Sequence, residues 1–161
     1  MPDPVKNVRS AMFLARRAEL RPMSAFLEGF CGEAAVERDR CLRLNIVLEE
    51  LFVNTVSHGH RGDCDAPVWI TLEARPDAVQ LTYEDTAPPF NPFVHAVQTR
   101  KVGGLGVLLA RELAASRDYA YLFGRNRLRL AGAIFKRIPA FAGTTFSDHP
   151  YFGGRSDRAT K

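Results

Sequence analysis

The segment from about Val36 to His58 most restricts the fold, because it combines an apolar helix with one polar edge. Glu50, Asn54 and His58 follow one another at steps of four residues. Residues four apart project from the same face of a helix. The rest of the segment can pack inward through apolar residues, namely Leu44, Val47, Leu48, Leu51, Phe52 and Val56. A glycine-containing cluster at 59–63 ends the helix, so the fold must bury most of this segment and leave the polar edge accessible.

The remaining segments predict an α+β domain. We expect a short edge strand over 9–15, helices over 18–35 and 36–58, strands over 68–74 and 78–83, a loop over 86–102, a helix over 104–116, and strands over 119–123 and 127–131. Turn-forming residues join each strand pair into an antiparallel hairpin, and the loop is long enough to act as a lid. This order predicts a two-layer sandwich with a mixed or antiparallel sheet and helices on one face.

Length and composition fit one globular domain. The chain has 161 residues, of which 46% are hydrophobic and 25% charged, as is typical of a folded globular protein. We expect the domain to occupy residues 1–137. Residues 138–161 are rich in glycine, proline, serine and threonine, and we expect them to form a flexible tail.

Charge and cysteine content narrow the function classes. The formal net charge of +4 is mild and gives no argument for a nucleic-acid surface. No stretch approaches the roughly 20 apolar residues that a membrane span needs, and the amino terminus lacks a signal-peptide core. The cysteines are odd in number and widely spaced, at Cys31, Cys41 and Cys64, which indicates reduced thiols. We therefore expect a cytoplasmic protein without direct nucleic-acid or membrane contact.

The Glu50–Asn54 pair has the chemistry of a phosphoryl-transfer site. The amide oxygen of Asn54 suits magnesium, which keeps several waters and takes few protein ligands besides phosphates. One turn earlier, Glu50 could orient a hydroxyl or water near a terminal phosphate and accept its proton. Glu49 is the neighbouring competitor for this role. A Glu and an Asn four apart also occur by chance in many helices, so the surrounding motifs must decide.

Asp85 follows a strand in which apolar residues alternate, so its carboxylate would emerge at the strand end. A buried acceptor there could pair with the exocyclic amino group of adenine, a donor that guanine lacks at the same position. The alternative is that Glu84-Asp85-Thr86 forms a solvated turn.

Gly103-Gly104-Leu105-Gly106 opens a predicted helix, where free backbone N–H groups and the helix dipole favour phosphate. Arg100 and Lys101 stand directly before it and could neutralise phosphate charge. The alternatives are a flexible helix entry and a solvated loop.

A metal site is the competing interpretation of the cluster after the main helix. His58, His60 and Cys64 lie near Asp63 and Asp65, and all of these residue types can ligate zinc. Zinc sites usually have tighter paired spacings. Helix-capping and loop roles are therefore favoured.

Taken together, these motifs resemble the GHKL ATPase superfamily over about residues 10–131. The motifs are Leu44-x5-Glu50-x3-Asn54-x3-His58-Gly59, Asp85-x-Ala87-Pro88-x-Phe90-x-Pro92, Gly103-Gly104-Leu105-Gly106 and Gly124-Arg125-Asn126-Arg127-Leu128. Within that superfamily, the chain is most similar to the small single-domain anti-sigma-factor serine/threonine kinases. It departs from the pattern at Ala87, where the family usually has glycine.

The resemblance implies ATP and Mg²⁺ as cofactors and assigns roles to the motif residues. Glu50 would be the catalytic base, Asn54 the magnesium ligand and Asp85 the adenine acceptor. The further nucleotide-binding residues would be Ala87, Arg100, Lys101, Gly103, Gly104, Leu105, Gly106 and Asn126.

The resemblance also implies a function and partners. The protein would bind a sigma factor and phosphorylate a small antagonist protein, and a homodimer is left open. Two rivals remain: a partner-sequestering module of the same fold without catalysis, and the ATPase part of a sensor histidine kinase. The second is weaker, because no dimerising helical hairpin with a phospho-acceptor histidine precedes the ATPase motifs in this sequence.

Overall fold

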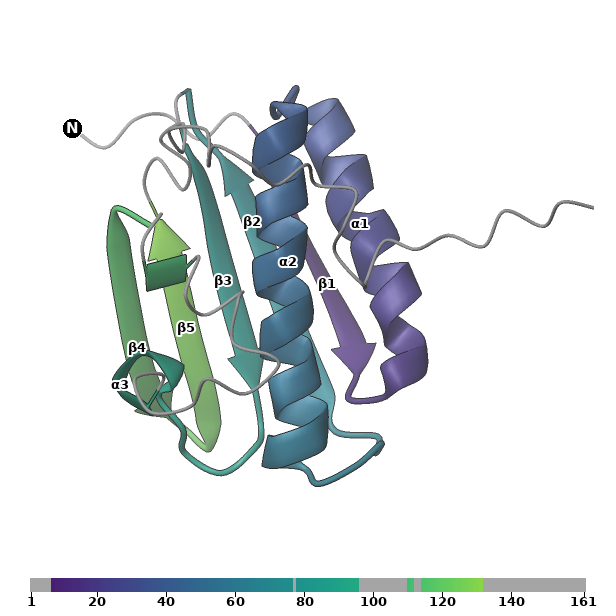
Figure 1. The fold of residues 1–161 in the computed structure, drawn as a ribbon, viewed down its shortest axis with the longest axis vertical. Helices are drawn as coiled ribbons and strands as arrows, with labels where there is room; N and C mark the ends of the chain where they lie inside the picture. The colour runs from purple at the N-terminus through teal and green to yellow at the C-terminus, as the bar shows by residue number, and fades with distance from the viewer. Residues whose placement is uncertain (1–6, 77, 96–109, 112–113, 132–161) are drawn as a thin grey trace, which may run out of the picture.

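The computed structural model describes residues 7–76, 78–95, 110–111 and 114–131 (Figure 1). Its elements in chain order are β1 (Asn7–Leu14), a 3-10 turn (Arg17–Glu19), α1 (Leu20–Glu33), α2 (Arg38–Asn54), a π-helical turn (Thr55–Gly59), β2 (Pro67–Ala74), β3 (Val79–Asp85), α3 (Pro92–His95), β4 (Ser116–Leu122) and β5 (Arg125–Ala131).

The described strands form one antiparallel sheet of five strands in the order β1-β2-β3-β5-β4. Helices α1 and α2 lie side by side on one face of this sheet (Figure 1). The predicted two-layer α+β sandwich is therefore confirmed, with an antiparallel sheet. The edge position of β1 and both predicted hairpins, β2–β3 and β4–β5, are also confirmed.

Strand alternation determines which side chains face the helices. In β3 every second residue is buried, and the series runs through Val79, Leu81, Tyr83 and Asp85. Successive strand side chains point to opposite faces, so the carboxylate of Asp85 shares the helix-facing side with the apolar residues before it. Helix α2 covers this side through its buried face, which consists of Leu44, Val47, Leu48, Leu51 and Phe52.

The outer face of the sheet is polar or exposed. The guanidinium of Arg125 lies 3.8 Å from the centre of the Trp69 ring, and Arg127 pairs with Glu84 at 3.1 Å. These pairs join β5 to β2 and to β3 across the outer side of the sheet, where a cation over an indole is worth roughly 0.5–1 kcal/mol.

The structure corrects the predicted loop over 86–102, because Pro92–His95 forms the short helix α3 inside it. The side-chain oxygen of Asn91 accepts a hydrogen bond from the Phe93 backbone N–H at 3.0 Å. Asparagine before a helix and proline at its first position are standard initiation signals, so the Asn-Pro pair indicated this helix and the prediction missed it.

The predicted helix over 104–116 ends too late, because Ser116 begins β4 and pairs with Ala131. Of this segment, the structure describes only Ala110 and Arg111 as helical. The predicted boundary between domain and tail near residue 137 lies outside the described residues. Among the helices that the structure describes, none has the length and apolar character needed to cross a bilayer.

Candidate functional site

A cavity of about 540 Å³ lies where α2 and β3 end and β5 begins. Pockets of this size accept cofactor-sized ligands. The described residues that line it come from the end of α2, the turn after it, the ends of β3 and β5, and the loop to α3: Leu51, Asn54, Thr55, His58, Gly59, Arg61, Tyr83, Asp85, Ala87, Pro88, Pro89, Phe90, Pro92, Asn126 and Leu128.

The helix changes from α to π geometry at the cavity. The predicted helix over 36–58 is observed as α2 and a final π-helical turn, Thr55–Gly59. The backbone N–H of His60 donates to the Thr55 carbonyl at 2.9 Å, a step of five residues instead of four. Single π turns inside helices concentrate at functional sites. This turn brings the buried Thr55 side chain to the floor of the cavity.

Asp85 forms the polar floor and is only 5% exposed. Its Oδ1 accepts hydrogen bonds from the Ala87 backbone N–H at 2.9 Å and from the Asn126 Nδ2 at 2.8 Å. Its Oδ2 accepts from the Thr55 hydroxyl at 2.7 Å. The solvated-turn alternative for Asp85 is therefore wrong, because the carboxylate is buried and held on both oxygens.

A carboxylate offers about four acceptor positions, and the described residues supply donors to three of them. The Oδ2 of Asp85 accepts one hydrogen bond, from Thr55, and the side chain lines the cavity, so this oxygen can accept a further hydrogen bond from a donor there.

Tyr83 and Thr55 extend the network into the core. The Tyr83 hydroxyl lies 2.8 Å from the Thr55 hydroxyl. Because Thr55 has one proton and donates it to Asp85, Tyr83 must be the donor in this contact. Burial raises the pKa of Tyr83 well above its ordinary value, and the nearby Asp85 charge raises it further, against the lowering effect of the Thr55 hydrogen bond. Tyr83 therefore stays a neutral donor that fixes Thr55.

Asn126 closes the floor from β5 and is 2% exposed. Besides Asp85, its Nδ2 contacts the carbonyl oxygens of Ala87 and Pro88 at 2.9 and 3.2 Å. Its Oδ1 accepts from the Phe90 backbone N–H at 3.0 Å and the Tyr119 hydroxyl at 2.8 Å. Its predicted role as a direct nucleotide ligand stays a prediction, and the observed contacts are all within the protein.

Asn54 and Glu50 lie at the edge of the site, in the last turns of α2. The Nδ2 of Asn54 is 3.5 Å from the Oε1 of Glu50, so the pair is in contact as the four-residue spacing predicted. Asn54 lines the cavity, whereas Glu50 lies one turn before Asn54 and is not among the described lining residues. An amide whose nitrogen faces Glu50 presents its oxygen, the atom that binds magnesium, in the other direction.

Glu49 is directed elsewhere. Its Oε1 accepts from the Ser24 hydroxyl at 3.1 Å and from the Asn45 Nδ2 at 2.8 Å. The first of these contacts ties α2 to α1, on a different side of the helix from Asn54. Of the two carboxylates, Glu50 is therefore the one that contacts Asn54.

Ala87 and Gly59 approach each other closely. Ala87 is 4% exposed, and a Cβ built on Gly59 would lie 2.6 Å from the Ala87 Cβ. Real Cβ atoms do not come this close, so Gly59 supplies the space that the Ala87 methyl occupies. The departure from the family pattern at Ala87 is thus accommodated by the end of the helix.

The zinc alternative gains no support from the described residues, among which no three His, Cys, Asp or Glu side chains gather around a common point. His58 instead lines the cavity, and the backbone N–H of Cys64 donates to the Ala15 carbonyl at 2.9 Å. The three cysteines are unbridged.

The phosphate side of the predicted site cannot be compared with the structure. Arg100, Lys101, Gly103, Gly104, Leu105 and Gly106 all lie outside the described residues. Arg61 lines the described wall, is exposed, and was missed by the sequence reasoning. Only its place in the cluster at 59–63 signalled it.

Thr55, Tyr83 and Tyr119 were also missed. Tyr83 continues an apolar alternation and therefore resembles an ordinary core residue in sequence. Thr55 follows Asn54 directly, and nothing in the sequence signals the π turn that directs it inward.

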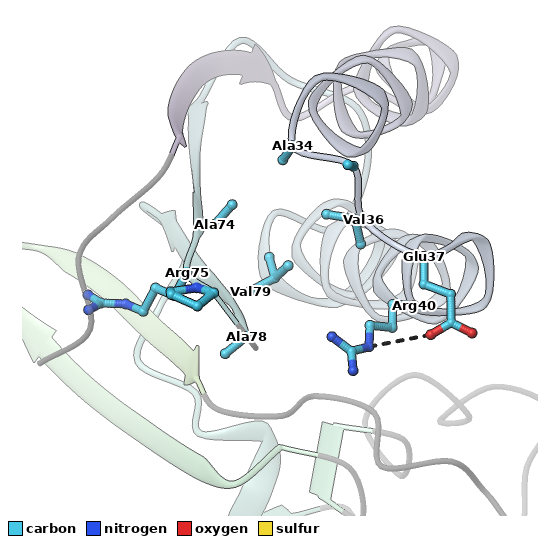
Figure 2. A pocket seen from close by; sticks show the side chains of 10 residues that line it. Ala34, Val36, Glu37, Arg40, Ala74, Arg75, Ala78 and Val79 are labelled. Carbon is cyan, nitrogen blue, oxygen red and sulfur yellow. Dashed lines mark ion pairs between the residues drawn. The ribbon is translucent and has the colours of Figure 1, made fainter.

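A second, smaller hollow of about 200 Å³ lies at the opposite end of α2, between the α1–α2 connection and the β2–β3 turn (Figure 2). Ala74, Val36 and Val79 face it, while Arg40 pairs with Glu37 at 3.8 Å at its border. It contains no buried polar side chain among its lining residues.

Comparison with known proteins adds the family. No curated protein matches the chain in a sequence comparison. The family model described as the histidine kinase-like ATPase domain matches residues 13–131, a range that begins in β1, ends with β5 and contains the whole described cavity. An ATPase domain implies ATP binding, and the cavity of about 540 Å³ has the volume of a typical cofactor pocket. The match spans well over half of the sequence, and the chain therefore belongs to the histidine kinase-like ATPase domain family.

Proposed function

We propose that this protein is an ATP-dependent protein serine/threonine kinase of the anti-sigma type. The observation that carries the proposal is the buried carboxylate of Asp85, which three donors hold at the floor of a cavity of about 540 Å³. Asn54 and Glu50 contact each other one turn apart beside this cavity. The site thus combines a base-recognition group with the pair that phosphoryl transfer requires.

Asp85 would select adenine. Its Oδ2, which accepts one hydrogen bond from Thr55, would accept a second from the exocyclic amino group, whereas guanine presents a carbonyl oxygen at that place. Two acceptors would then face each other at the buried floor of the cavity, so the same geometry that favours ATP disfavours GTP.

Asn54 and Glu50 would divide the work at the phosphates. When bound, magnesium supplies charge neutralisation at the phosphate oxygens, and Asn54 would be its protein ligand. Glu50 would hold the hydroxyl of the acceptor serine or threonine and take its proton as that oxygen bonds to the γ-phosphorus and the bond from this phosphorus to the departing ADP breaks. The 3.5 Å contact between the Asn54 Nδ2 and the Glu50 Oε1 holds these two side chains next to each other.

The partners follow from the resemblance to anti-sigma-factor kinases. The protein would bind a sigma factor and phosphorylate a small antagonist protein, which would leave the sigma factor bound. We infer a cytoplasmic site of action, as for transcription regulators in general.

The test is transfer of labelled γ-phosphate to antagonist proteins encoded near this gene. Glu50→Ala should lower transfer roughly 100-fold or more while ATP affinity stays largely unchanged, because a general base acts mainly in the transition state. Asn54→Ala should weaken both transfer and magnesium-dependent ATP binding. Glu49→Ala is the matched control. It removes the same charge at the neighbouring residue, whose side chain bonds Ser24 and Asn45 instead of Asn54.

Two results would contradict the proposal. Full transfer by Glu50→Ala together with loss of transfer by Glu49→Ala would show that Glu49, and not Glu50, is the catalytic base. A wild-type protein that binds ATP and a sigma factor but transfers no phosphate would be the non-catalytic sequestering module instead.

A further inference from the structure

Asn126 makes five polar contacts, and their arrangement fixes its orientation. Its Nδ2 faces three acceptors, the Oδ1 of Asp85 and the carbonyl oxygens of Ala87 and Pro88, at 2.8, 2.9 and 3.2 Å. Its Oδ1 faces two donors, the Phe90 N–H at 3.0 Å and the Tyr119 O–H at 2.8 Å. A flipped amide would set oxygen against three acceptors and nitrogen against two donors, so only one orientation satisfies the site.

These contacts join three parts of the cavity wall. Asn126 sits on β5, Asp85 ends β3, and Ala87 to Phe90 form the loop that leads to α3. The loop residues Ala87, Pro88 and Phe90 line the cavity together with Asp85. Two prolines in this loop cannot donate backbone hydrogen bonds. Hydrogen bonds from a side chain must therefore hold much of the loop in place.

We propose that Asn126, oriented by Tyr119, is a positioning residue. It orients the Asp85 carboxylate toward the adenine ring and holds the 87–90 loop in place as the adjacent wall of the cavity. This inference rests on the proposed function, because it assumes an adenine nucleotide in the cavity. Asn126 acts through Asp85 and the loop, and the nucleotide selectivity of the site depends on it.

The argument predicts a specific consequence of charge. In Asn126→Asp the shape is nearly unchanged, but an acceptor replaces the donor 2.8 Å from Asp85. Two carboxylates this close cannot both ionise without cost, so one of the pair has a raised pKa. At low pH the shared proton again bridges the two oxygens, and at higher pH it is lost and the carboxylates repel.

The sharpest experiment measures Mg·ATP and Mg·GTP affinity by calorimetry at pH 5 and pH 8 for wild type, Asn126→Asp and Asn91→Asp. For Asn126→Asp we expect ATP affinity to fall at least about tenfold at pH 8 and to recover to within about threefold at pH 5. The ATP preference over GTP should shrink along with it at pH 8.

Asn91→Asp is the matched control. It adds the same charge in the loop before α3, but its oxygen already acts as an acceptor for the Phe93 N–H, so we expect affinity within about twofold of wild type at both pH values. A purely structural effect of Asn126→Asp would lower stability without restoring selectivity at low pH.

Tyr119→Phe provides a milder second variant if Asn126→Asp does not fold. It removes one of the two donors to the Asn126 Oδ1 and should raise the ATP dissociation constant about two- to tenfold, with little change for GTP. If every variant that folds, Asn126→Asp or Tyr119→Phe, keeps the wild-type preference for ATP over GTP, the proposal is overturned.

The outcomes separate this inference from the proposed function. If wild type binds neither nucleotide, the proposed function fails. The change in melting temperature of Asn126→Asp between pH 5 and pH 8 then still tests whether Asn126 joins β3, β5 and the 87–90 loop. If wild type prefers ATP and Asn126→Asp matches it at both pH values, the positioning role is wrong while the proposed function stands.

Discussion

The two hollows at opposite ends of α2 differ in what lies at their floors. At the carboxyl end of the helix, Asp85, Thr55 and Asn126 are buried in a cavity of about 540 Å³, and Asp85 accepts a hydrogen bond from each of the other two. At the amino end, the hollow of about 200 Å³ has alanine and valine at its floor, and its charged residues lie at the border (Figure 2). Burying polar groups costs free energy unless they are satisfied, so a chain retains such a network where it has a use. Among the described lining residues, the buried polar network lies at the carboxyl end of α2, which is why the proposed binding site is placed there.

The largest effect that we expect on stability tests the close packing at the functional end. Gly59→Ala places a Cβ 2.6 Å from the Ala87 Cβ, and such overpacking costs about 1–3 kcal/mol in the free energy of unfolding. Urea denaturation measures the loss. Ala87→Gly in the same chain should restore most of it, because the two methyl groups compete for one space.

Gly32→Ala is the control for this substitution. A Cβ at Gly32 meets nothing within 4 Å, and replacing glycine by alanine in a helix stabilises by up to about 1 kcal/mol. Equal destabilisation by both glycine substitutions, or no rescue by Ala87→Gly, would show that the Gly59–Ala87 contact does not control packing here.

The next effect tests the buried hydroxyl network. Tyr83→Phe removes the donor to Thr55 and should lower the free energy of unfolding by about 1–2 kcal/mol at pH 7. Its effect should also depend on pH. The pKa of Tyr83 is raised in the folded state, so its contribution is complete below the unfolded pKa of about 10 and is lost as the pH rises above it.

Denaturation curves between pH 8 and pH 11 check the sign. Wild type should lose stability above about pH 10 more steeply than Tyr83→Phe, because only the wild-type unfolded state gains a tyrosinate at this position. Burial also raises the pKa of Cys31, and this contribution is common to both proteins and cancels in the difference. Parallel curves would contradict the assignment of Tyr83 as a neutral buried donor.

The smallest effect is expected at the other hollow. The side chain of Ala74 points toward Val36 and Ala34 across it (Figure 2). Ala74→Val adds two methyl groups to empty space on a strand, where a β-branched residue is favoured, so the free energy of unfolding should change by less than about 1 kcal/mol. A large loss of stability or of ATP affinity would mean that the two ends of α2 are less independent than their linings indicate.

Most of the layer structure could be predicted from the sequence, because periodicity determines which faces are buried. The alternation through Val79, Leu81 and Tyr83 and the apolar face of α2 placed β3 and the helix correctly. Local chemistry was harder. The Asn91–Pro92 initiation of α3 was overlooked, and the end of the helix before β4 was set too late.

Spacing and motif predicted some residues of the cavity and not others. Glu50, Asn54 and Asp85 were predicted in this way, and the structure brings Asp85 and Asn54 to one cavity, with Glu50 in contact with Asn54 one turn before it. Thr55 and Tyr119 could not be found in this way, because their roles depend on a π turn and on pairing across β4 and β5. Such contacts are set by tertiary structure.

The central claim is that Asp85 recognises adenine at the carboxyl end of α2, and calorimetric titration with Mg·ATP and Mg·GTP tests it most directly. Wild type should prefer ATP, and Asp85→Asn should lose at least about tenfold in ATP affinity with little change for GTP, since an unpaired buried polar group costs about 1–3 kcal/mol. Asp118→Asn, at an exposed position of β4, should leave both affinities unchanged. Equal affinity of the wild-type protein for ATP and GTP, or an Asp85→Asn variant that still prefers ATP, would contradict the account.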